Sequence, residues 1–209
     1  MMKKLIWKYK YLVFLFFPLF LLLFSFRESE SGFSFDLGRY FPKQNYNKEE
    51  RMVYAHLTSD SENKLTAHEK KELARAIVRH AQRLQLPDGM TLGGYKPIPS
   101  LFLYVWAKTR TKFSPNISKG YGILALPEIL VRNFERKAGA KINRRFDISS
   151  YSIQYKMIIL LYKELLAAGE TPEAAYLKLY GNASSPSEWK LLEKNYKVLH
   201  EQVTYESKP

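Results

Sequence analysis

The chain has no cysteine among its 209 residues, and this absence excludes several kinds of chemistry. Disulfide frameworks, thiol nucleophiles, cysteine-ligated zinc and lipid attachment through cysteine all need that side chain. The four histidines (His56, His68, His80 and His200) are widely spread, and no two have the spacing of a helical metal site. A nucleophile elbow and a glycine-rich phosphate loop are missing as well. We therefore expect no metal and no cofactor.

Positive charge is in clear excess. Lysine and arginine number 33 against 20 aspartates and glutamates, which gives a net charge of +13 and a pI near 9.7. Such a field favours polyanionic partners: nucleic acid, anionic lipid headgroups or an acidic cell-wall polymer. The cations are dispersed along the chain, however, and a solvated surface also explains them. Composition alone does not choose among these possibilities.

The N-terminus has the order of a membrane-targeting segment. Several lysines within the first ten residues precede an apolar run from Tyr11 to Phe26. As a helix this run is about 24 Å long, short of the roughly 30 Å hydrocarbon core of a bilayer. Counted from Leu5, with Lys8 and Lys10 reaching to the headgroups, residues 5–26 are long enough to span it.

Three interpretations of residues 1–26 stay open: an uncleaved membrane anchor, a signal peptide cleaved near Ser29-Glu30-Ser31, and a buried core helix. In the first two, the lysines keep the N-terminus cytoplasmic and the remainder is exported. We expect a single-pass cell-membrane protein whose C-terminal domain is extracytoplasmic (periplasmic), or, alternatively, a secreted one. Export argues against nucleic acid as a partner.

The remainder of the chain predicts an all-α domain, residues 47–209, behind a linker at 27–46. Helix starts are well marked, with an N-cap at Asn47, capping boxes at Thr66–Glu69 and Ser185–Glu188, and Thr171 before Pro172. No window shows the sustained alternation of a β-sheet. We expect six to eight helices, among them an apolar and fully buried run from Leu101 to Ala107, begun by Ser100. A further helix after Ser149 or Ser150 should turn Ile153, Met157, Ile158, Leu161 and Leu165 inward.

One stretch resembles a known family. Phe113-Ser114-Pro115-Asn116 follows the buried run, the turn Gly120-Tyr121-Gly122-Ile123-Leu124-Ala125-Leu126-Pro127 comes next, and a short helix later ends in Tyr180-Gly181. This order resembles the soluble lytic transglycosylase domain, a lysozyme-like all-α fold that cleaves peptidoglycan glycan strands. In that family a helix ends in Glu-Ser-x-Phe-x-Pro, a Gly-Leu-Met-Gln turn follows, and Ala-Tyr-Asn-Ala-Gly closes the groove. The resemblance covers about residues 70 to 183.

The resemblance also implies that the site has changed. Counting back from Phe113 places Arg110 where the family has its catalytic glutamate, Ala125 where it has the glutamine, and Gly181 where it has the asparagine. The family's reaction needs a carboxylic acid that protonates the glycosidic oxygen. A guanidinium cannot do this, because it stays protonated at any relevant pH.

Two roles for the charged residues stay open. Glu128 is the candidate for a displaced acid, but the first turn of a helix lowers the pKa of a carboxyl, so a helix-start charge is the simpler interpretation. Arg110 and Lys112 could hold muropeptide carboxylates, or could be solvent-facing charges at a helix end. With Ala125 and Tyr180 they form the expected substrate-binding set. The catalytic residue itself stays unknown.

Three functions therefore remain possible. The first is an active peptidoglycan lytic transglycosylase with a shifted glutamate. The second is a catalytically dead domain, anchored in the membrane, that binds peptidoglycan glycan. The third is a non-catalytic helical envelope scaffold or interaction protein, unrelated to lysozyme folds. The sequence favours the second.

Overall fold

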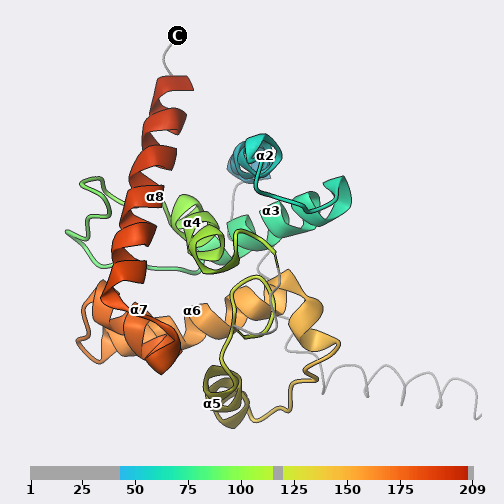
Figure 1. The fold of residues 1–209 in the computed structure, drawn as a ribbon, viewed down its shortest axis with the longest axis vertical. Coiled ribbons are helices and arrows are strands. Elements are labelled where there is room, and N and C mark those ends of the chain that lie inside the picture. The colour runs from blue at the N-terminus through green and yellow to red at the C-terminus, as the bar shows by residue number, and fades with distance from the viewer. Residues whose placement is uncertain (1–42, 115–119, 207–209) are drawn as a thin grey trace, which may run out of the picture. The chain divides into compact units, whose positions relative to one another are not determined.

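The chain from Lys43 onward folds as a compact helical unit in a computed structural model that describes residues 43–114 and 120–206 (Figure 1). Its described part contains seven α-helices, and the only strand-like pairings within it are two isolated bridges. The predicted all-α class is confirmed. The helices are α2 (Lys43–Ser59), α3 (Ala67–Ala81), α4 (Pro99–Thr111), α5 (Glu128–Ala138), α6 (Tyr151–Ala167), α7 (Pro172–Tyr180) and α8 (Pro186–Glu206).

Helix α4 lies in the middle of this unit. It packs against α2 and α3 on one side and α8 on the other, as the green helix of Figure 1 shows. Every side chain from Leu101 to Ala107 is buried, so the predicted buried run is confirmed. The expected start at Ser100 is wrong. The helix begins at Pro99, since proline suits a first turn where its missing N–H is not needed, and Ser100 is buried inside that turn.

Helix α8 is joined to both ends of α4 by hydrogen bonds. The Tyr196 hydroxyl accepts a bond from the backbone N–H of Ile98 at 2.8 Å. In the last turn of α4, the Thr109 hydroxyl accepts a bond from the Asn195 side-chain amide at 3.0 Å. These contacts hold the middle of α8 against α4, and the contact of Glu188 with Arg110 brings the first turn of α8 to the C-terminal end of α4.

Helix α6 supports α3, α5 and α7. Met157, Ile158 and Leu161 are buried, while Ile153 and Leu165 are partly buried and pack against the same core, so the predicted inward face is confirmed. A 3₁₀ turn, Asp147–Ser149, leads into the helix, and Ser150 is its N-cap.

Two helix starts confirm the sequence patterns. The Thr66 hydroxyl accepts from the backbone of Glu69, and the Glu69 carboxylate accepts from the backbone of Thr66 at 2.8 Å, which is a complete capping box. At the start of α7, the Thr171 hydroxyl accepts from the backbone N–H of Ala174, which is the first half of such a box.

Two helix boundaries and one helix cap differ from what the sequence pattern predicts. Helix α2 begins at Lys43 rather than Asn47, since residues 43–46 contain no helix breaker. Helix α3 ends at Ala81, although the apolar stripe of its sequence continues to Leu84 and the first helix breaker is Pro87, because the chain tightens there into i→i+3 hydrogen bonds that keep Leu84 buried. At the start of α8, the Ser185 hydroxyl bonds to Ser187, and the Glu188 carboxylate turns to Arg110.

The predicted anchor or signal peptide, residues 1–26, and residues 27–42 of the predicted linker lie outside the described residues. Pro115 and Asn116 of the motif after Phe113 lie outside them too. Among the residues that are described, no helix is both long and apolar enough to cross a membrane.

Candidate functional site

The C-terminal end of α4 closes with an unusual turn. Lys112 and Phe113 both have a positive φ, of 53° and 60°, a conformation that costs an ordinary side chain roughly 1–2 kcal/mol. The Phe113 ring is buried against Tyr104, with ring centroids 5.0 Å apart. The Thr111 hydroxyl donates to the Ile123 carbonyl at 2.5 Å. Burial of the Phe113 ring opposes the strain of the two positive φ angles. The Thr111–Ile123 hydrogen bond holds the turn at residues 120–127 against the end of α4.

The turn at residues 120–127 is held by Gln154 of α6. Its side-chain oxygen accepts from the backbone N–H of Leu124 at 3.3 Å, and its side-chain nitrogen donates to the Ile148 carbonyl at 2.8 Å. A Cβ on Gly122, whose φ is +67°, would come within 2.5 Å of the Gln154 amide. Glycine is therefore required here by both space and conformation.

Ala125, one of the predicted substrate-binding residues, lies in this turn. It is fully buried and has a φ of 45°. Its methyl group is part of the packed interior and offers no polar group to a ligand.

Arg110 is buried, with the ring of Tyr180 packed against its guanidinium. Its side chain is 4% exposed and its guanidinium lies 3.9 Å from the centre of the Tyr180 ring, a cation–π contact. Its Nη1 is 2.6 Å from the Glu188 carboxylate at the start of α8. Burial lowers the pKa of Arg110, but Tyr180, Tyr176 and Glu188 raise it more. The guanidinium is charged, and this ion pair joins α4 to α8.

Tyr180 completes the same cluster from the end of α7. Its hydroxyl accepts a hydrogen bond from the Trp106 indole at 2.9 Å, and its ring packs against Tyr176. Burial raises the pKa of Tyr180 well above its ordinary value, so the hydroxyl is neutral. The structure thus brings two predicted site residues, Arg110 and Tyr180, into direct contact although they are far apart in sequence.

Lys112 has different neighbours. It is exposed, and its ammonium is 2.8 Å from Glu62, which lies between α2 and α3. Arg110 and Lys112 therefore engage separate partners on separate elements and do not form one carboxylate-binding pair.

Glu128, the candidate displaced acid, starts α5 and is surrounded by cations. It accepts hydrogen bonds from Arg132 at 2.8 Å and from Arg144 at 3.0 Å. Arg144 first, then Arg132, lower the pKa of Glu128 to about 2. A general acid for glycosidic cleavage needs the opposite shift.

The sequence interpretation missed two residues of this site, Gln154 and Glu188. Gln154 carried no signal at all in its apolar helix. Glu188 was interpreted as half of a capping box, because its spacing from Ser185 suits one. Its actual partner, Arg110, is 78 residues away, and nothing in the local pattern identifies so distant a contact.

The described residues gather no group of three or more histidines, aspartates or glutamates that could hold a metal ion. No protein-family model matches the chain, and no curated protein or solved structure matches it significantly.

Proposed function

We propose that this protein is a non-catalytic, lysozyme-like helical domain, held outside the cytoplasm by residues 5–26, that binds peptidoglycan glycan strands. The proposal is supported by the three segments on which the family resemblance rests, because they meet in space. The end of α4 contacts the turn at 120–127 through Thr111 and Ile123, and it contacts the end of α7 through Arg110 and Tyr180.

The burial of Arg110 is the observation that supports a non-catalytic domain over an active transglycosylase. At the position that corresponds to the family's acid there is a guanidinium, 2.6 Å from Glu188 and covered by Tyr180. A guanidinium neither protonates a glycosidic oxygen nor accepts a proton. Glu128, the candidate displaced acid, has its pKa lowered to about 2, which does not suit a general acid.

A second candidate is the helical envelope scaffold. It is favoured by the burial of Arg110, Ala125 and Tyr180, since these three side chains of the predicted binding set have no surface to offer a sugar. Lys112 alone of the set is exposed. In this alternative the Arg110–Glu188 pair is a structural link between two helices and nothing more.

The test is incubation of the full-length protein with purified peptidoglycan sacculi, followed by co-sedimentation and analysis of released products. We expect binding without anhydro-muropeptide release, and weaker binding at high salt because the chain is basic. Lys112→Gln should weaken binding, whereas substitution of Lys197, an exposed lysine of α8, by glutamine should not.

Each other outcome has a defined meaning. Product release that Glu128→Gln abolishes would show an active enzyme with a displaced acid. The absence of both binding and products would favour the scaffold. Arg110→Ala is not a useful binding variant, because it would leave the Glu188 carboxylate without its buried partner.

A further inference from the structure

The loop between α5 and α6 is fixed by its own hydrogen bonds. The Asn143 side-chain oxygen accepts from the backbone N–H groups of Arg145 at 2.9 Å and Phe146 at 3.2 Å. The Asp147 carboxylate accepts from the backbone of Asn143 at 2.7 Å. Phe146 therefore has a defined backbone position.

Arg144 fastens this loop to α5. Its guanidinium donates to Glu135 at 2.5 and 2.9 Å and to Glu128 at 3.0 Å, and its Nη1 also reaches the Ile142 carbonyl. These bonds lower the pKa of Glu135, like that of Glu128, to about 2. Both carboxylates therefore stay ionised and keep their bonds to Arg144 across the physiological pH range.

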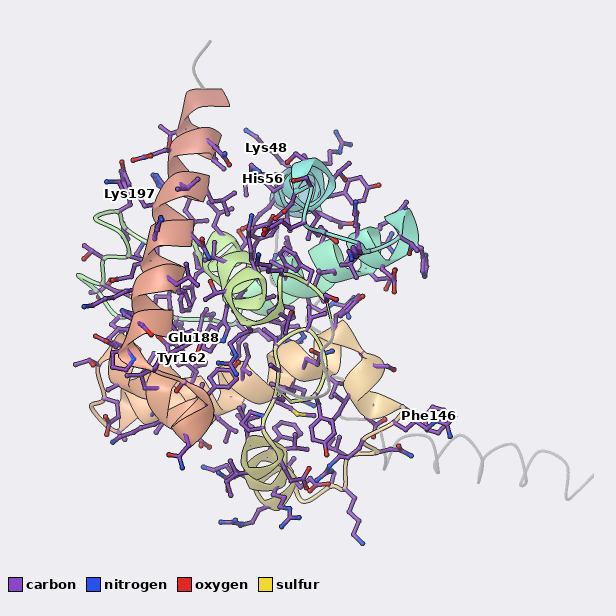
Figure 2. The ribbon with its side chains drawn as sticks, viewed as in Figure 1. Lys48, His56, Phe146, Tyr162, Glu188 and Lys197 are labelled. Carbon is purple, nitrogen blue, oxygen red and sulfur yellow. The ribbon has the colours of Figure 1, made fainter. Side chains whose placement is uncertain are left out.

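Arg145 and Phe146, the two residues that follow Arg144 in the chain, face solvent. Phe146 is 68% exposed, the most exposed of the large apolar side chains in the described residues, and Figure 2 shows it pointing away from the helices. The Arg145 guanidinium is 5.7 Å from the centre of its ring. Lys141 is exposed in the same loop, and no ion pair is formed by Lys141 or Arg145 within the described part of the chain. We call Lys141, Arg145 and Phe146 the basic–aromatic loop.

Helix α5, to which the loop is clamped, presents the same combination of side chains. Ile129 is 56% exposed, and Arg132 and Arg136 follow it at i+3 and i+7, which places the three on one helix face. Between Ile129 and Phe146 the only acid is Glu135, and Arg144 neutralises it.

We propose that the basic–aromatic loop binds a membrane surface rich in anionic phospholipid, with Lys141 and Arg145 on the headgroups and the Phe146 ring in the interfacial layer. Basic segments gain affinity for anionic leaflets from each cation, and apolar and aromatic side chains enter the boundary between headgroups and acyl chains. A purely anionic polymer would bind Lys141 and Arg145, but it would not bury the exposed ring of Phe146. This contact is separate from the glycan-binding proposal and uses none of its residues.

The absence of natural cysteine makes a site-specific probe possible. An environment-sensitive fluorophore is attached to Ala140→Cys, an exposed position beside Lys141, in the full-length protein. The control carries the same fluorophore on Lys197→Cys, which Figure 2 places on α8, away from Phe146. Each protein is reconstituted with vesicles of phosphatidylcholine alone or mixed with phosphatidylglycerol. Nitroxide-labelled lipid then reports contact, whether or not residues 5–26 already hold the chain in the bilayer.

We expect quenching of the Ala140→Cys probe in anionic vesicles only, and no quenching of the Lys197→Cys probe. Arg145→Gln should reduce the loop-docking equilibrium constant about fivefold, the effect of one cation near an anionic surface. Phe146→Ser should reduce it about tenfold through lost apolar burial. Because these side chains are exposed, thermal unfolding of both variants should match the parent.

Equal quenching in neutral and anionic vesicles, or equal quenching of the two probes, would overturn the proposal. So would salt-sensitive binding of the loop to a soluble polyanion such as polyphosphate that Phe146→Ser leaves unchanged, since the partner would then be a polymer. If Phe146→Ser unfolds early, Lys141→Gln tests the headgroup contact through another exposed side chain, and unchanged docking of that variant to anionic vesicles would overturn the proposal.

Discussion

Arg110 shows how burial decides the role of a side chain. With its side chain 4% exposed and that of Glu188 19% exposed, the pair is largely removed from water. We expect Glu188→Gln to destabilise the protein by about 3 kcal/mol, because it leaves a buried guanidinium without its counter-charge. The measurement is denaturant unfolding followed by circular dichroism.

The exposed pair Lys112–Glu62 is the matched control. Its side chains are 65% and 49% exposed, so Glu62→Gln should cost less than about 1 kcal/mol. The double variant Arg110→Met, Glu188→Leu should recover most of the stability lost in Glu188→Gln, since apolar groups need no partner. Equal losses from Glu188→Gln and Glu62→Gln would mean that the Arg110 pair is not buried in solution.

His80 predicts a pH dependence of stability. Burial, with the charges of Arg83, Arg79 and Lys156, lowers its pKa from 6.5 to about 4. The unfolded chain therefore binds more protons than the folded one between these values, and stability falls as the pH falls from about 6.5 to about 4. The largest loss from this group is about 3 kcal/mol.

The comparison for this prediction is His80→Gln, which keeps a polar group near Ser152, the hydrogen-bond partner of His80 at 2.9 Å. Unfolding free energies at pH 7 and pH 4.5 should differ less in the variant than in the parent. The pKa values of Glu128 and Glu135 are lowered from 4.5 to about 2, so the stability they contribute is lost mainly below pH 4.5, and parent and variant share that loss. An unchanged difference in the variant would assign the acid sensitivity to other groups.

At the scale of one element, α6 carries the apolar core of the second half of the chain. Met157 is fully buried, whereas Leu160 on the same helix is 38% exposed. We expect Met157→Ala to lower the free energy of unfolding by about 2–5 kcal/mol, through lost contacts and an unfilled cavity. Leu160→Ala should cost clearly less. Similar losses at the two positions would show that α6 is not packed as the structure has it.

The two predicted capping boxes show where local interactions decide a helix start and where a distant partner does. Thr66–Glu69 forms its capping box because every atom of the box lies within one turn. Ser185–Glu188 has the same spacing, but the Glu188 carboxylate pairs with Arg110 at 2.6 Å. A charged partner inside the protein is a stronger attraction for a carboxylate than an exposed backbone N–H at a helix start.

At the scale of the whole molecule, the charge asymmetry of the N-terminus predicts topology. Alkaline phosphatase, which needs disulfides and an oxidising compartment, is fused after Pro209. We expect activity with the full-length chain, because lysines before an apolar run favour a cytoplasmic N-terminus and export of the chain that follows. A fusion that starts at Lys43 is the control and should be inactive. Equal inactivity of both fusions would place the domain in the cytoplasm and would make nucleic acid a candidate partner again.

The sequence by itself determined the all-α class, most helix starts and the buried run of α4, because caps, periodicity and apolar runs act within a few residues of one another. It also predicted that Arg110 and Tyr180 belong to one site, through the family resemblance, and these two side chains are in contact. Only the tertiary structure decided what that site contains. Glu188 and Gln154 reach it from helices distant in sequence, and burial turns a candidate ligand-binding arginine into an internal ion pair. Such contacts depend on how the helices pack, and no local pattern encodes them.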